Sequence, residues 1–186
     1  MGVLIFGIFL REEQMPHHEI ERKFLIRYPD LEYISNIPGT EKILITQTYL
    51  RKGEKGENRR IRIWDRRWPD PEKRYIYTEK EKISDIDRIE SETFITKSAY
   101  KSLYAEKDPE CSTLYKARYR IPGEGFVYEL DIFQYWKKQA ILEIELSSED
   151  EAYTIPDYLE VHRELTFDKT FTNHSFARNG FPKGEL

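Results

Sequence analysis

The sequence has few of the residues that mark a disulfide-stapled or zinc-binding protein. Cys111 is the single cysteine among 186 residues, which excludes an internal disulfide framework and a cysteine-based zinc site, and a reducing cytoplasm fits best. The histidines show no metal-ligand spacing. An excess of positive charge is also missing, because the formal net charge is -4. This balance argues against a general binder of nucleic acid or of anionic membranes.

Long apolar runs are scarce as well. The opening stretch MGVLIFGIFL is too short for a membrane span, and it lacks the basic lead of a secretory signal. We therefore expect residues 1–16 to be an N-terminal extension, either disordered or packed, or upstream of a true start at Met15. Residues 17–181 should form a single domain, and residues 182–186 a tail. A Walker-type glycine loop and a kinase signature are both absent.

What the sequence does contain is a repeated alternation of charged and apolar residues. In HHEIERKFLI, residues 17–26, a strand would place Glu19, Glu21 and Lys23 on the face opposite Phe24 and its apolar neighbours. Turn signals separate the repeats, so we expect antiparallel strands. Helices are expected at 29–35, 96–107, 147–153 and 173–178. The further strand segments are 46–51, 59–64, 75–82, 88–94, 114–121, 126–133 and 140–146.

Two architectures use such strands. An open sheet would show its charged face to solvent, whereas a closed barrel would enclose the charges. Acidic residues are poor strand formers, so their frequency in these segments needs a reason. The charges are also segregated by strand: Arg60 and Arg62 share one segment, and Glu143 and Glu145 share another. Like charges this close repel, so they need a ligand of opposite charge. We therefore predict an α+β, mainly antiparallel β fold: a closed eight-stranded barrel forming a tunnel, with a charged interior and helices packed outside.

The two kinds of charge indicate two kinds of ligand. Several arginines and lysines together hold phosphate oxygens, and arginine matches them with two parallel hydrogen bonds. Grouped carboxylates hold a hard divalent ion, and Mg²⁺ completes its shell with water and substrate phosphates. A triphosphate with Mg²⁺ or Mn²⁺ is the simplest combination that satisfies both sets.

The opening strand also resembles a known motif. EIERK is similar to the Glu-x-Glu-x-Lys signature of the CYTH superfamily, the triphosphate tunnel metalloenzymes, which include inorganic and thiamine triphosphatases and class IV adenylate cyclases. The chain looks most like the short bacterial inorganic triphosphatase branch. It departs at the closing motif, where the usual Asp-Lys-Arg-Tyr is replaced by residues 168–171, Asp-Lys-Thr-Phe. The companion motifs follow in order over residues 17–178: QTYL, RRIR, YTEK, RIESE, YKARY, YELDIF, LEIEL and FDKTFTN.

The resemblance implies an eight-stranded tunnel and a role for each matching residue. Lys23 and Tyr49 would be the catalytic pair that orients or deprotonates water. The metal ligands would be Glu19, Glu21, Glu143 and Glu145, with Glu90, Glu129 and Asp131 behind them or at a second metal. The phosphate-binding residues would be Arg60, Arg62, Lys80, Arg88, Lys116, Arg118 and Lys169.

These features predict a metal-dependent hydrolase that cleaves a phosphoanhydride of inorganic triphosphate or of a related triphosphate compound. A class IV adenylate cyclase and a non-catalytic polyphosphate-binding module are the alternatives. Both Glu-x-Glu pairs are present, which favours an enzyme, since a simple polyphosphate reader has no need of them. We expect a small-molecule partner and a monomer or homodimer, with no DNA or membrane partner and long RNA disfavoured by the acidic balance.

Overall fold

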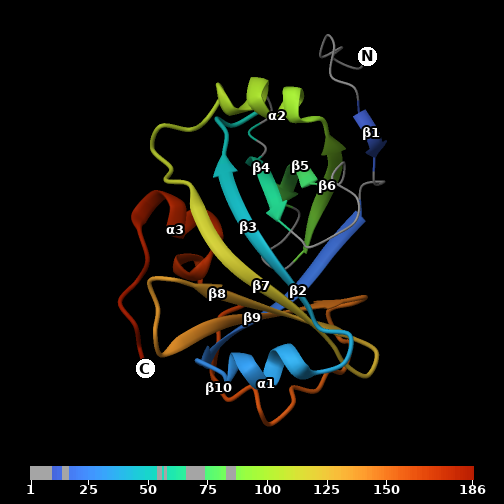
Figure 1. Ribbon diagram of the computed structural model, residues 1–186, viewed down its shortest axis with the longest axis vertical. Helices are drawn as coiled ribbons and strands as arrows, with labels where there is room; N and C mark the ends of the chain where they lie inside the picture. Colours follow the sequence, from blue (N-terminus) through green and yellow to red (C-terminus); the bar gives the residue numbers. More distant parts are fainter. Residues whose placement is uncertain (1–9, 14–16, 54–55, 57, 66–73, 83–86) are drawn as a thin grey trace.

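The computed structural model describes residues 10–13, 17–53, 56, 58–65, 74–82 and 87–186. Within them the chain forms one antiparallel sheet and a few short helices (Figure 1). The strands are β1 Leu10–Glu13, β2 His17–Arg27, β3 Glu41–Tyr49, β4 Asn58–Asp65, β5 Tyr75–Lys82, β6 Asp87–Ile95, β7 Leu114–Pro122, β8 Val127–Phe133, β9 Gln139–Leu146 and β10 Val161–Glu164. The helices are α1 Leu31–Asn36, α2 Lys97–Tyr104, the 3-10 helix η2 Lys169–Phe171 and α3 Asn173–Asn179.

The predicted α+β class and antiparallel pairing are confirmed, but the predicted closed eight-stranded barrel is wrong. The sheet has ten strands in the order β1-β6-β5-β4-β3-β7-β8-β9-β2-β10. β2 also pairs with β6, but only over His17–Ile20. Further along, β10 occupies that edge of β2 at Phe24–Ile26, and β1 pairs with the end of β6. Beyond this short contact, β10 and β1 take the two edges that would have to meet, so the sheet does not close into a barrel.

The helices cover the apolar face of the sheet, and local signals explain where they begin. Asp30 caps α1 by accepting hydrogen bonds from the backbone N–H groups of Glu32 and Tyr33, and Thr96 caps α2 in the same way. Ile34 of α1 packs into the core formed by β2, β7, β8 and β9. α2 packs on Ile61 and its neighbours. Figure 1 shows these two helices at opposite ends of the molecule.

The helix expected at 147–153 is absent, because the chain forms a turn there and then runs without regular structure. A capping box would have Glu151 reach the backbone of Ser148. The Glu151 carboxylate interacts mainly with Ser147, accepting hydrogen bonds from its backbone N–H and its hydroxyl, and it also interacts with the backbone of Ser148. The carboxylate thus closes a turn in place of starting a helix.

A third core cluster lies under the C-terminal segment. Trp136 packs edge-on against Phe176 and Phe181, at ring-centroid distances of 5.4 Å in both cases. The Trp136 indole N–H donates to the carbonyl of Pro182 at 3.2 Å. These contacts fix α3 and the chain end beside β8 and β9. None of the helices among the described residues is long and apolar enough to cross a membrane.

Candidate functional site

The charged face of the curved sheet lines a cavity of about 480 Å³. Strands β2 to β5 and β7 to β9 and the segment 166–179 all contribute side chains to it. Most of the residues proposed from sequence meet here: Glu19, Glu21, Lys23, Tyr49, Arg60, Arg62, Lys80, Lys116, Arg118, Glu129, Glu143, Glu145 and Lys169. Glu90 and Asp131 lie behind residues of this set, as described below. The side chain of Arg88 falls outside the described part of the chain.

Four glutamates on β2 and β9 form what we call the acidic wall (Glu19, Glu21, Glu143 and Glu145). The register places Glu21 directly opposite Glu145 and Lys23 directly opposite Glu143. Lys23 Nζ lies 3.2 Å from Glu21 Oε1 and 3.0 Å from Glu143 Oε1. Burial lowers the pKa of Lys23, but the two carboxylates outweigh it and raise that pKa above its ordinary value. Lys23 is therefore held as a cation between them.

Glu19 begins the acidic wall near the point where β2 leaves β6. Lys80 Nζ donates to Glu19 Oε1 at 2.7 Å and also pairs with Glu90. Burial, Glu21 and Glu90 raise the pKa of Glu19 despite Lys80. Burial also acts against ionised Glu90, but Arg60 and Lys80 outweigh it and lower its pKa to about 2. Lys80 thus pairs with two carboxylates, and the negative charge of Glu19 is less well compensated than that of Glu90.

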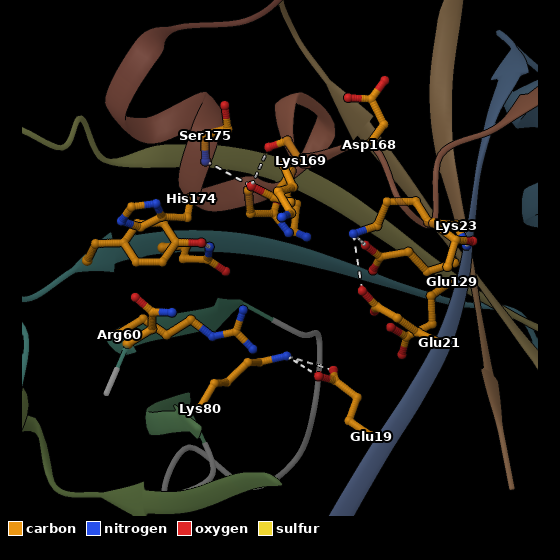
Figure 2. Close-up of a pocket in the computed structure, with 18 of the residues that line it drawn as sticks. Glu19, Glu21, Lys23, Arg60, Lys80, Glu129, Asp168, Lys169, His174 and Ser175 are labelled. Atoms are coloured by element: carbon orange, nitrogen blue, oxygen red, sulfur yellow. Dashed lines mark hydrogen bonds and ion pairs between the residues drawn. The ribbon is translucent and has the colours of Figure 1, made fainter. Parts of the chain in front are cut away.

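Five basic residues form what we call the basic wall (Arg60, Arg62, Lys80, Lys116 and Arg118, on β4, β5 and β7). Figure 2 shows Arg60 and Lys80 reaching into the space that Glu19, Glu21 and Lys23 approach from the other side. Arg60 Nη2 lies 3.3 Å from Glu90 Oε1. Burial and the nearby Arg60 lower the pKa of Arg62 to about 9. A cation crowded in this way gains from the arrival of an anion.

Asp131 anchors the β7 part of the basic wall from behind. It is 1% exposed and does not line the cavity. Arg118 Nε and Nη2 donate to its two carboxylate oxygens, both at 2.7 Å. The ammonium of Lys116 donates to the same carboxylate. This two-pronged pairing fixes the guanidinium plane of Arg118, whose Nη2 also donates to Glu143 at 2.5 Å.

The cavity also has a side around Tyr49 and α3, where sequence reasoning identified Tyr49 but few of its neighbours. Gln47 Nε2 donates to the Tyr49 hydroxyl at 2.8 Å, and the rings of Tyr49 and His174 meet edge to face at 5.0 Å. Burial raises the pKa of Tyr49 to about 12, although Arg60 opposes this. Asp168 and Asn173, which belong to the closing motif FDKTFTN, also line the cavity, although the sequence assigned them no role. The other lining residues that were missed are Asn58, Thr166, Phe167, Thr172, Ser175 and Asn179. The amide side chains of NHSFARN, residues 173–179, were the remaining sequence signal for this side of the cavity. The local sequence does not predict where that helix packs.

The carboxylates of the acidic wall fit a divalent metal by their chemistry. Among the described residues no three or more carboxylate, imidazole or thiol groups are gathered into a metal-holding cluster. The donor chemistry nevertheless fits a hard cation, since Glu21 faces Glu145 across the sheet and Glu19 follows on the same face. Burial is the main cause of the raised pKa of Glu19, and repulsion from Glu21 and Glu90 adds to it. A cation among them would relieve that repulsion.

Comparison with known proteins supports the fold. No protein-family model matches the chain, and no curated protein matches its sequence. The crystal structure of the inorganic triphosphatase NE1496 matches with a TM-score of 0.53 and 24% identity, over 89% of this chain and 100% of that one. The crystal structure of the hypothetical protein NE1496 matches with a TM-score of 0.51 and 24% identity, over 86% and 97%. The chain shares the fold of these structures, and this likeness is consistent with the CYTH resemblance of its motifs.

Proposed function

We propose that the chain, which has a CYTH-type fold, is a divalent-metal-dependent hydrolase that cleaves a phosphoanhydride of inorganic triphosphate or a related triphosphate compound. One observation carries this proposal: the acidic wall and the basic wall face each other across a single cavity. The two walls are partly paired with each other, as in Lys80–Glu19 and Arg118–Glu143. A polyanion alone would draw the basic residues away from these carboxylates, and a cation alone would draw the carboxylates away from the basic residues. A metal-bound triphosphate satisfies both. The likeness to an inorganic triphosphatase structure supports the same conclusion.

The basic wall would bind the phosphate chain. Arg60, Arg62 and Arg118 are buried or nearly so. Charge-assisted hydrogen bonds are strong in such a site, and they would compensate the phosphate for the water it loses on binding. Lys169 reaches the same cavity from η2 (Figure 2). Phosphoryl transfer needs little covalent chemistry from the protein, so positioning and charge neutralisation by these side chains are the main contribution we assign them.

The acidic wall would hold Mg²⁺ or Mn²⁺ through Glu19, Glu21, Glu143 and Glu145, with Glu129 at the same cavity. When bound, such an ion polarises phosphate oxygens and lowers the pKa of a coordinated water. Lys23 and Tyr49 would orient the attacking water. Both have raised pKa values, so the first stays an ammonium and the second a neutral phenol near pH 7. Each can donate a hydrogen bond, and neither is suited to remove a proton in the ligand-free protein.

A substrate panel tests the proposal. Purified protein is incubated with inorganic triphosphate, ATP, thiamine triphosphate and short polyphosphate under Mg²⁺ or Mn²⁺, and both phosphate and cyclic AMP are measured. We expect phosphate release, and a higher KM in Arg60→Ala. The matched control is Arg27→Ala, because Arg27 is exposed and pairs with Glu160 away from the cavity. Cyclic AMP would indicate the cyclase, and tight binding without turnover would indicate the binding module.

A further inference from the structure

Arg163, on β10, lies at the centre of a small ionic network beside the cavity. Its Nη2 donates to Asp168 Oδ2 at 2.9 Å and to Glu185 Oε1 at 2.8 Å, and its Nε donates to Glu185 Oε2 at 2.9 Å. The guanidinium carbon lies 5.0 Å from the ring centroid of Phe171, the last residue of η2. Arg163 therefore joins three parts of the chain: β10, the start of η2 and the segment that follows α3.

The segment that follows α3 orients this arginine. Glu185 binds Arg163 through both carboxylate oxygens, a geometry that fixes the plane of the guanidinium. The backbone N–H of Glu185 donates to Gln139 Oε1 at 2.8 Å, and Gln139 is buried on β9. The Pro182 carbonyl accepts the hydrogen bond from the Trp136 indole described above. The segment is thus anchored to the body of the protein at two points, and its carboxylate has a defined position.

Asp168 is the other partner of Arg163, and it lines the cavity. Burial acts against its ionised form, but hydrogen bonds from Thr170 and Arg163 outweigh burial and lower its pKa. Thr170 donates its backbone N–H to Asp168 Oδ1 at 3.0 Å and its hydroxyl to the same oxygen at 2.6 Å. Asp168 is therefore a carboxylate near pH 7, and both of its oxygens accept hydrogen bonds.

A carboxylate in this position works against the binding of a polyanion. Lys169 is the next residue, and its side chain lines the cavity in which the phosphate chain would lie. A negative charge beside it repels phosphate and attracts the lysine ammonium. Figure 2 shows the Asp168 carboxylate turned away from Arg60, whereas the side chain of Lys169 extends into the cavity. The hydrogen bonds that Asp168 accepts from Arg163 and Thr170 account for its orientation.

The positive charge beside Asp168 comes from outside the closing motif. Where the motif Asp-Lys-Arg-Tyr has arginine, this chain has Thr170, which donates to Asp168 but carries no charge. Arg163 supplies a cation from β10. Without Arg163, Asp168 would lose that cation and keep the neutral donors of Thr170.

We propose that Arg163 and Glu185 are positioning residues for the phosphate-binding cavity. Glu185 orients Arg163, which in turn holds the Asp168 carboxylate away from the phosphate chain. The turn thus presents the positive charge of Lys169 to the phosphate and withholds the negative charge of Asp168. Neither Arg163 nor Glu185 is among the described residues that line the cavity, so both act through Asp168. The inference rests on the proposed function and adds a second layer of residues to that site.

The split between KM and kcat tests this role. Arg163→Gln should raise KM for inorganic triphosphate about three- to tenfold and change kcat less, because the variant leaves a partly exposed negative charge uncompensated beside the substrate. Glu185→Gln should raise KM by a smaller factor, since Arg163 keeps its bond to Asp168. Arg27→Gln is the matched control, because Arg27 pairs with Glu160 on the surface, away from the cavity, and its KM should equal that of the wild type.

Two further measurements distinguish this role from a purely structural one. Asp168→Asn in the Arg163→Gln background removes the uncompensated charge while asparagine can still cap η2, so KM should return most of the way to the wild-type value. The effect of Arg163→Gln should also shrink at high ionic strength, because salt screens partly exposed charges. An unchanged KM in Arg163→Gln, no recovery in the double variant or an effect of equal size at low and high salt would each overturn the inference.

A binding measurement separates failure of the positioning role from failure of the hydrolase. Calorimetry with imidotriphosphate and Mg²⁺ needs no turnover. If no substrate is cleaved, the proposed hydrolase fails, but a Kd that rises about three- to tenfold in Arg163→Gln and recovers in the double variant would still support the positioning role. Equal Kd values in the wild type and Arg163→Gln would contradict it, and no binding by the wild type would overturn both proposals. Circular dichroism of each variant shows that a loss is not one of folding.

Discussion

Lys23 lies directly opposite Glu143 in the pairing of β2 with β9, and its Nζ is 3.0 Å from Glu143 Oε1. Lys23 could remove a proton from water only if its neighbours lowered its pKa, because a protonated amine cannot act as a base. The two carboxylates beside it do the opposite. Lys23 therefore holds the acidic wall together while the cavity contains no cation, and it has a positive charge to offer a ligand.

The first prediction concerns this internal cation. Lys23→Gln should lower the free energy of unfolding by about 3–5 kcal/mol, because Glu21 and Glu143 are left without it. Urea denaturation at pH 7 measures the loss, and added Mg²⁺ should restore part of it by occupying the same carboxylates. Arg27→Gln, which breaks an exposed pair with Glu160, should cost about 0–1 kcal/mol. A loss no larger than this control would show that Lys23 does not compensate the carboxylates.

The second prediction concerns Asp131. Asp131→Asn removes the charge that orients Arg118, so kcat/KM for triphosphate should fall about 10–100-fold, mainly through a higher KM. Steady-state kinetics measure the split between KM and kcat. Asp157→Asn is the matched control, because Asp157 is exposed and lies outside the cavity. A change confined to kcat would contradict a role in holding Arg118.

The third prediction is a pH dependence that arises from Lys116. Burial and Arg118 lower its pKa to about 8, although Asp131 opposes them. The group is charged below that pH and neutral above it, so affinity for an anionic triphosphate should weaken as pH rises from 7 to 9. KM measured across this range tests the shift, and Lys116→Arg should flatten it because arginine stays protonated. An identical rise in Lys116→Arg would assign the effect to another group.

The same pKa shift has a consequence for stability. In the unfolded chain Lys116 has its ordinary pKa of 10.5, so between about pH 8 and 10.5 the unfolded state binds more protons. Stability from this group therefore rises with pH over that window. The difference in unfolding free energy between wild type and Lys116→Met should move in favour of the wild type from pH 8 to pH 10.

The fourth prediction concerns the metal. Glu145 faces Glu21 across the sheet, and its side chain lines the cavity. Glu145→Gln should raise the Mg²⁺ or Mn²⁺ concentration needed for half-maximal activity at least tenfold, because a hard cation prefers carboxylate to amide oxygen. Glu149→Gln, an exposed change in the following turn, is the control. An unaltered metal titration would remove Glu145 from the proposed ligand set.

Much of the cavity was predictable because strand alternation is a short-range property. Glu19 and Glu21 share a face wherever β2 packs, and so do Arg60 and Arg62 on β4. The residues that pack behind a given side chain, however, come from other strands, and alternation within one strand does not identify them. Glu129 and Asp131 alternate in the same way, yet Glu129 lines the cavity and Asp131 sits beneath Arg118. Only the three-dimensional packing separates a lining carboxylate from an anchoring one.

The sequence could not predict that the sheet stays open, for a related reason. It depends on β1 and β10, two strands of four residues each, which carry no extended alternation. Their sequences, LREE and VHRE, are polar and would pass for loops. The position of α3 was equally hidden, because Phe176 joins the cluster around Phe133 and Trp136 through contacts distant in sequence.

The brief pairing of β2 with β6 makes the two sides of the cavity mechanically unequal. Among the described residues the two strands pair over His17–Ile20, and Lys80 of β5 adds a side-chain bridge to Glu19 there. A cation that draws Glu19 away would remove that bridge. Amide hydrogens at His17–Ile20 should then exchange with solvent faster than those at Leu25, which is enclosed between β9 and β10. Exchange at His17–Ile20 would therefore report whether a cation occupies the acidic wall.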